Sequence, residues 1–104
     1  MGKGWGKIFE VIGEFQRNLE SIKRELEEKR VSATAGGGVV TAEVNGKQEL
    51  VSLKIDPEVL DSKDVEMLEG LIIAAVNEAL RRSKELIKEE MTKLAGGLPL
   101  PDIF

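Results

Sequence analysis

The first thirty residues carry a narrow apolar stripe that a chain of this size cannot cover by itself. Its apolar residues recur at alternating intervals of four and three residues. This spacing is typical of a coiled-coil seam and predicts one long helix over about residues 5–30, packed on a partner helix. At 1.5 Å per residue the helix would be about 39 Å long, so it would project beyond a small domain. The stripe consists of Ile8, Ile12, Phe15, Leu19, Ile22 and Leu26.

After residue 30 the apolar period changes from that of a helix to that of a strand. Alternation over residues 31–35, 40–44 and 50–55 predicts a three-stranded antiparallel meander with one apolar face, and in the third strand that face would take Val51, Leu53 and Ile55. The glycine run 36–38 favours a tight turn over an anion-binding loop, because no Lys-Ser or Lys-Thr follows it. Asn45-Gly46 predicts a two-residue type I′ hairpin turn.

The dipeptide Asp56-Pro57 ends the third strand. Proline has no amide hydrogen for the sheet, and its fixed φ suits the first turn of a helix, which Asp56 can cap. A single carboxylate with no base or metal beside it cannot carry out catalysis, so this pair is interpreted as a corner. A short helical turn and a second long helix, over about residues 64–94, follow. The fold class is therefore α+β.

The composition indicates a single domain over residues 1–104 and excludes several classes of protein. The chain has no cysteine, histidine or tyrosine, so it offers no thiol nucleophile, no zinc site of the usual ligands and little for acid–base catalysis. We expect no enzyme activity, no catalytic residues, no metal and no cofactor. Residues 1–4 and 96–104 could be flexible, although the tail could also dock through Ile103 and Phe104.

Three motifs in register resemble the bacterial YbaB/EbfC family of nucleoid-associated proteins. They are G-G-G-V-V-T-A-E-V-N-G (36–46), K-I-D-P-E-V-L (54–60) and M-L-E-G-L-I-I-A-A-V-N-E-A-L-R-R (67–82). The resemblance covers essentially the whole chain. It implies a tweezer-like homodimer with a shared sheet, and binding of double-stranded DNA with little sequence preference. The chain departs from the family at its first helix, W-G-K-I-F-E-V-I-G-E-F-Q-R, and at Gly70, where the family favours a carboxylate.

Basic residues gather in two places, at the end of the first helix and in the second half of the last one. Residues 81–93 include five cations and three carboxylates, whereas residues 64–80 include no cation. Complementarity with the helix dipole is an equal explanation for the second cluster, and ordinary ion pairing with glutamates for the first. The predicted DNA-binding residues are Lys23, Arg24, Lys29, Arg30, Arg81, Arg82, Lys84 and Lys88.

Two functions remain open from the sequence. The first is a cytoplasmic, nucleoid-associated homodimer that binds DNA mainly through phosphates. The second is a dimeric scaffold whose projecting helix seams dock protein partners, which the net charge of −4 favours. Near the N-terminus, Trp5 and Phe9 suit packing better than base stacking. No small-molecule substrate and no membrane association are expected, since no apolar run approaches the ~20 residues that span a bilayer.

Overall fold

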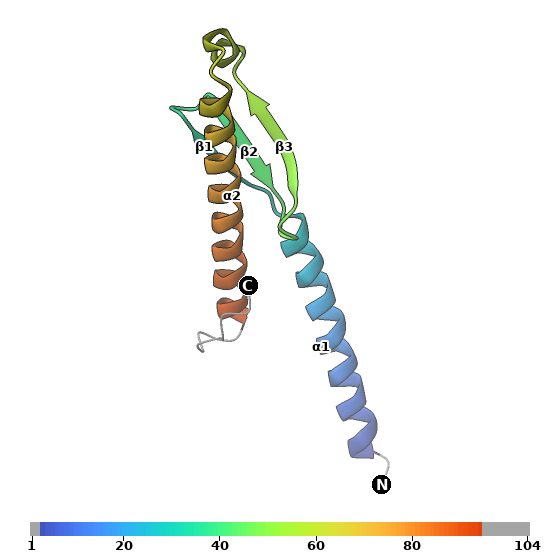
Figure 1. The fold of residues 1–104 in the computed structure, drawn as a ribbon. Helices are drawn as coiled ribbons and strands as arrows, with labels where there is room; N and C mark the ends of the chain where they lie inside the picture. The colour runs from blue at the N-terminus through green and yellow to red at the C-terminus, as the bar shows by residue number, and fades with distance from the viewer. Residues whose placement is uncertain (1–2, 95–104) are drawn as a thin grey trace.

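The chain forms a small antiparallel sheet that follows one long helix in the sequence and precedes a second one. The computed structural model describes residues 3–94, and the ends of the chain predicted to be flexible lie outside this range apart from Lys3 and Gly4, which belong to the first helix. Both helices extend from the same end of the sheet and diverge (Figure 1). The predicted element order is confirmed: α1 (Lys3–Glu28), β1 (Val31–Ala35), β2 (Val40–Val44), β3 (Leu50–Ile55), η1 (Pro57–Ser62) and α2 (Val65–Leu94).

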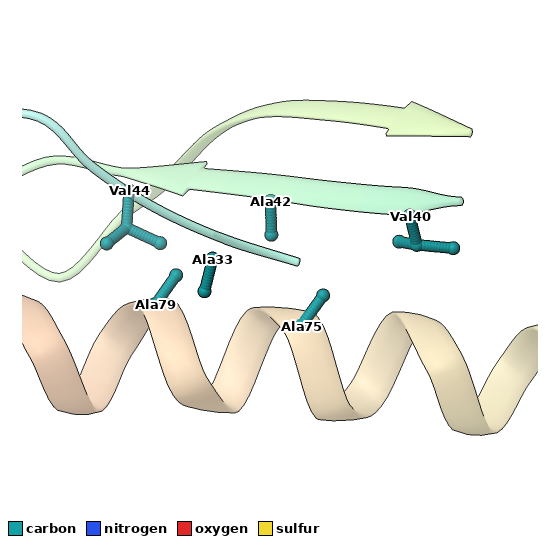
Figure 2. Close-up of a cluster of buried hydrophobic side chains, with 6 residues drawn as sticks. All are labelled: Ala33, Val40, Ala42, Val44, Ala75 and Ala79. Carbon is teal, nitrogen blue, oxygen red and sulfur yellow. The ribbon is translucent and has the colours of Figure 1, made fainter. Parts of the chain in front are cut away.

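The core lies between α2 and the first two strands of the sheet, whose order is β1-β2-β3. The contact is made by small side chains, which allow the helix to lie close to the strands (Figure 2). Alternation places every second residue of β2 on the covered face, as the sequence predicted. The buried residues of this cluster are Ala33, Val40, Ala42, Val44, Ala75 and Ala79.

The third strand lies at the edge of the sheet and is less well covered. Ile55 and Leu53 pair with Val40 and Ala42, as the alternation predicts, but a bulge shifts the register so that Leu50 faces Val44. The bulge therefore interrupts the predicted alternation at Val51, which has no pairing partner in β2. Leu53 remains 38% exposed, so β3 offers apolar surface that α2 does not cover.

The two sheet turns differ from each other. Gly36, Gly37 and Gly38 all have positive φ, which confirms the predicted tight turn between β1 and β2. The predicted type I′ turn at Asn45-Gly46 is wrong, because neither residue has positive φ and Gln48 has a φ of 66° instead. The side chain of Asn45 closes a longer loop by accepting hydrogen bonds from the amides of residues 47 and 49.

The corner after β3 is as the sequence predicted. The Asp56 carboxylate accepts a hydrogen bond of 3.0 Å from the Glu58 amide, and Pro57 opens the 3-10 helix η1. The Asp64 side chain caps α2 through the Met67 amide in the same way. These contacts fix the direction in which α2 returns across the sheet, and they account for both aspartates without a chemical role.

The shape of the molecule is far from that of a compact monomer. Its extents are 76 × 23 × 16 Å and its radius of gyration is 20.3 Å, against about 13 Å for a compact domain of this length. Most of α1 lies away from the rest of the chain (Figure 1), and its apolar residues are exposed, including Phe9 at 66% and Phe15 at 62%. Only the last turns of α1 pack on the body, where Leu26 is buried.

Candidate nucleic-acid interface

The arginine pair of α2, Arg81 and Arg82, belongs to an ion-pair network along the helix. Arg81 binds Glu78 and Glu85, each at 2.5 Å, which are neighbours at three and four residues on the helix surface. Arg82 binds Glu78 at 3.1 Å and donates a longer hydrogen bond to the Ser32 carbonyl of β1. Both predicted DNA-binding arginines are therefore already engaged by carboxylates.

This network changes the protonation equilibria of its members. The hydrogen bond from Arg81 lowers the pKa of Glu78 from 4.5 to about 2, and Arg82 adds to the shift while partial loss of hydration opposes it. The same hydrogen bond raises the pKa of Arg81 further above its usual range. Glu78 is thus a carboxylate at any pH at which a nucleic acid would be bound, and it competes with phosphate for both arginines.

The basic residues at and after the end of α1 contact α1 itself, α2 and β2. Lys23 lies 3.9 Å from Glu27 on its own helix, and Lys29 lies 3.9 Å from Glu90 of α2. The Arg30 guanidinium donates a hydrogen bond of 2.9 Å to Glu43 of β2. Since Glu43 pairs across the strands with Ser32, Arg30 from the segment between α1 and β1 and Arg82 from α2 contact the same strand pair. Two of the predicted residues therefore contact paired positions of β1 and β2.

Three predicted residues remain. Arg24 lies in α1, and its exposed side chain makes no ion pair within residues 3–94. Lys84 is likewise exposed on α2 and makes no ion pair in that range, and Lys88 lies one turn further along the helix. Both lysines follow Ser83, the residue of α2 that bonds to the β2–β3 turn.

A hollow of about 530 Å³ lies where the β2–β3 turn meets the end of α1. We call it the basic hollow, because three cations line it together with two carboxylates and an amide. One of the cations, Lys47, was missed by the sequence reasoning, since a lone lysine in a turn carries no periodic or clustered signal. The lining residues are Arg24, Glu27, Glu28, Arg30, Asn45 and Lys47.

The turn beside the hollow is held to both long helices. The Gly46 amide donates a hydrogen bond of 3.1 Å to the Glu27 carbonyl at the end of α1. The Ser83 hydroxyl of α2 donates one of 3.0 Å to the Asn45 carbonyl and accepts another from the Gln48 side chain. A Cβ at Gly46 would lie 1.8 Å from the Leu26 carbonyl oxygen. Only glycine therefore permits this approach, which explains the residue better than turn conformation does.

Other kinds of site are not supported in the part of the chain that the structure describes. Residues 3–94 contain no cluster of three or more acidic, histidine or cysteine side chains that could hold a metal ion. In the same range, no helix is long and apolar enough to cross a membrane. The arrangement can bind anions through exposed cations spread over α1, α2 and the β2–β3 turn.

Comparison with known proteins agrees with this type of interface. The model of the YbaB/EbfC DNA-binding family matches residues 1–98. A nucleoid-associated protein of Alkaliphilus metalliredigens is 48% identical over 93 residues, covering 89% of this chain and 82% of that protein. Another, from Clostridium kluyveri, is 46% identical over 103 residues and is covered to 90%. The fold and the matches define a bacterial nucleoid-associated class of protein.

The chain belongs to the YbaB/EbfC DNA-binding family. Among solved structures, an uncharacterized protein of Helicobacter pylori, HP0035, superimposes with a TM-score of 0.71 at 21% identity. The match covers 86% of this chain and 95% of that one. At this level of identity the likeness concerns the fold alone, and it confirms the arrangement of a long helix, a three-stranded sheet and a second long helix.

Proposed function

We propose that the protein is a homodimer that binds double-stranded DNA with little sequence preference, through basic side chains on its projecting helices. The family and the names of the relatives support DNA binding. The observation that carries the proposal is that a cation from the segment after α1 and a cation from α2 both contact one pair of strands. Arg30 reaches Glu43 and Arg82 reaches Ser32, on facing positions of β1 and β2.

The ion pairs of these residues are compatible with phosphate binding. Pairs between exposed side chains contribute only about 0–1 kcal/mol each, so a DNA phosphate can replace a carboxylate at small cost. The chain has a net charge of −4, so any affinity for a polyanion must come from locally clustered cations. Phosphates are the same for all base pairs, and such contacts therefore give affinity without sequence preference.

Exposed apolar surface supports the homodimer. The edge strand β3 exposes Leu50 at 47% and Leu53 at 38%, and Ile73 of α2 is 59% exposed. An unpaired strand edge is a template for another strand. A second copy would cover this edge and give the seam of α1 a partner helix.

The salt dependence of DNA binding tests the proposal. If each protomer contacts three phosphates, the dimer should show a slope of about −5 in log K against log salt concentration. Fluorescence anisotropy with duplexes of unrelated sequence should give the same slope and similar affinities. A slope near zero would contradict phosphate binding, and a monomer in sedimentation equilibrium at the same concentrations would contradict the homodimer.

A second candidate function is a dimeric scaffold that docks a protein on α1. It is favoured by one observation, the exposed apolar residues at the free end of that helix, among them Trp5 at 56% and Phe9 at 66%. Their aromatic rings lie 6.5 Å apart. The scaffold function would be supported by protein partners that remain bound after nuclease treatment of a lysate and are lost when Trp5→Ala and Phe9→Ala are combined.

We further propose that the protein acts in the cytoplasm, at the nucleoid.

A further inference from the structure

The basic hollow differs from the helix surfaces in that its cations come from different elements. Arg24 belongs to α1, Arg30 to the segment before β1, and Lys47 to the turn between β2 and β3. The two carboxylates that share the lining leave a net positive charge of one. Of these carboxylates, Glu27 already lies 3.9 Å from Lys23. Arg30 is likewise paired with Glu43, so the net charge of plus one is unchanged when the partners outside the lining are included.

Two of the three cations are not compensated by the rest of the described chain. Neither the Arg24 nor the Lys47 side chain makes an ion pair within residues 3–94, and both are exposed. Arg30 makes one hydrogen bond, from Nη1 to Glu43. A guanidinium carries five N–H donors, so Arg30 keeps donors for a second acceptor while Glu43 holds it in place.

The hydrogen bonds of the turn fix the position of Lys47 before any ligand arrives. Its own amide donates to the Asn45 side chain at 2.9 Å, and the Asn45 carbonyl accepts from Ser83 of α2. The neighbouring Gly46 amide is bonded to the end of α1. Because the backbone beside the hollow is held at three points, binding an anion there requires ordering of the cationic side chains but not of the turn itself, which favours affinity.

We propose that the basic hollow binds a phosphate group, and that in the complex this group is a backbone phosphate of the DNA duplex; the second clause rests on the proposed function. Arginine guanidinium groups match the oxygens of a phosphate, and lysine supplies a compact charge beside them. Arg30 lines the hollow itself, and Lys29 precedes it at the junction between α1 and β1. A DNA strand that crosses this junction can contact the hollow and the helix cations together, so Lys47 extends the interface beyond the helices.

The Lys47→Gln variant tests this assignment against a matched control. The control is Lys54→Gln, which removes an equal charge from an exposed position of β3 outside the hollow. In anisotropy titrations, Lys47→Gln should make the salt slope less negative by about one unit for each protomer that contacts a phosphate. The loss of affinity should be the same for unrelated duplexes. If the wild-type protein binds DNA and both variants show its slope, the hollow does not contact DNA.

A titration with inorganic phosphate separates this proposal from the proposed function. In ¹⁵N-labelled protein, phosphate should shift the amide resonances of Gly46 and Lys47 more than chloride does at equal ionic strength, and Lys47→Gln should abolish the difference. If the protein binds no DNA but shows these shifts, the site takes a free phosphate and only the proposed function fails. If phosphate and chloride act alike, the hollow is not a phosphate site. Circular dichroism of each variant should match that of the wild type.

Discussion

The two basic regions of this molecule differ in how their charge is compensated. The arginine pair of α2 forms ion pairs with Glu78 and Glu85, whereas Arg24 and Lys47 of the basic hollow make none within residues 3–94. The reason is geometric. Residues three and four apart on a helix are neighbours, so Arg81 and Arg82 meet carboxylates of their own helix. Lys47 lies in a turn and has no such built-in partner, and Arg24 makes no ion pair in the described range although Glu20, Glu27 and Glu28 lie at helical spacing from it. The density of charge in the sequence is therefore a poor guide to which cations an anion can reach.

The largest expected effect is a loss of stability when the β2–β3 turn beside the basic hollow is pushed away from the end of α1. Gly46→Ala places a Cβ 1.8 Å from the Leu26 carbonyl oxygen, a backbone atom that cannot rotate away. We expect the turn to move from α1, with a loss of about 3 kcal/mol in the free energy of unfolding. The urea midpoint at fixed protein concentration measures it.

The control for this substitution is Gly70→Ala on α2, where a Cβ would contact nothing within 4 Å. Because alanine is the better helix former, this variant should be more stable by about 1 kcal/mol. An unchanged urea midpoint for Gly46→Ala would show that the turn does not hold the end of α1. The cations of the basic hollow would then not be held together by this contact.

The second effect ranks the two regions by charge reversal. Replacing Arg24 and Lys47 by glutamate should weaken binding to any duplex by about a hundredfold at low salt, whereas the same change at Arg81 and Arg82 should cost about tenfold. The difference follows from the carboxylates that already engage the arginine pair. Anisotropy measured at one salt concentration compares them, and equal losses would mean that the ion pairs do not limit access to the arginines.

A third effect removes the competition on α2. Glu78→Gln releases both arginines from their shared carboxylate, so DNA affinity should rise about threefold and the salt slope should become more negative by up to about one unit. Glu69→Gln is a suitable control, because this exposed residue of the same helix makes no ion pair in residues 3–94. If both variants gain equally, the effect comes from net charge rather than from the network.

The smallest effect is a dependence of stability on pH. The folded-state pKa of Glu78 is lowered from 4.5 to about 2, so its contribution to stability is present above pH 4.5 and is lost as the pH falls towards 2. The melting temperature of the wild type should exceed that of Glu78→Gln at pH 7, and the difference should vanish near pH 2. Since the group is exposed, the difference should be small. A constant difference across this range would show that protonation of Glu78 does not contribute.

Local patterns predicted the fold closely, because each element carried its own signal. The heptad spacing predicted α1, the alternation predicted the three strands, and Asp56-Pro57 predicted the corner with its cap. The failure at Asn45-Gly46 arose because a short sequence does not show what a turn will touch. In the structure, Gly46 is required by the approach of the Leu26 carbonyl rather than by a positive φ.

The candidate interface was predicted less well than the fold. The sequence pointed to the cations at the end of α1 and in the second half of α2, and in the structure Arg30 and Arg82 contact one strand pair. It did not indicate Lys47, since nothing in the local pattern distinguishes this lysine from any other in a turn. Whether an individual cation contacts DNA is a prediction that the binding experiments decide.

The sequence by itself determined the order of the elements, the apolar stripe that α1 cannot bury, and the family to which the chain belongs. These properties depend on neighbours a few residues apart, and the chain specifies them wherever it is placed. Only the tertiary structure decided that the β2–β3 turn packs on the end of α1 and is held by Ser83 of α2. That contact joins residues up to 38 positions apart. It depends on the packing of the whole molecule, and it makes a separate lysine and two arginines into one hollow.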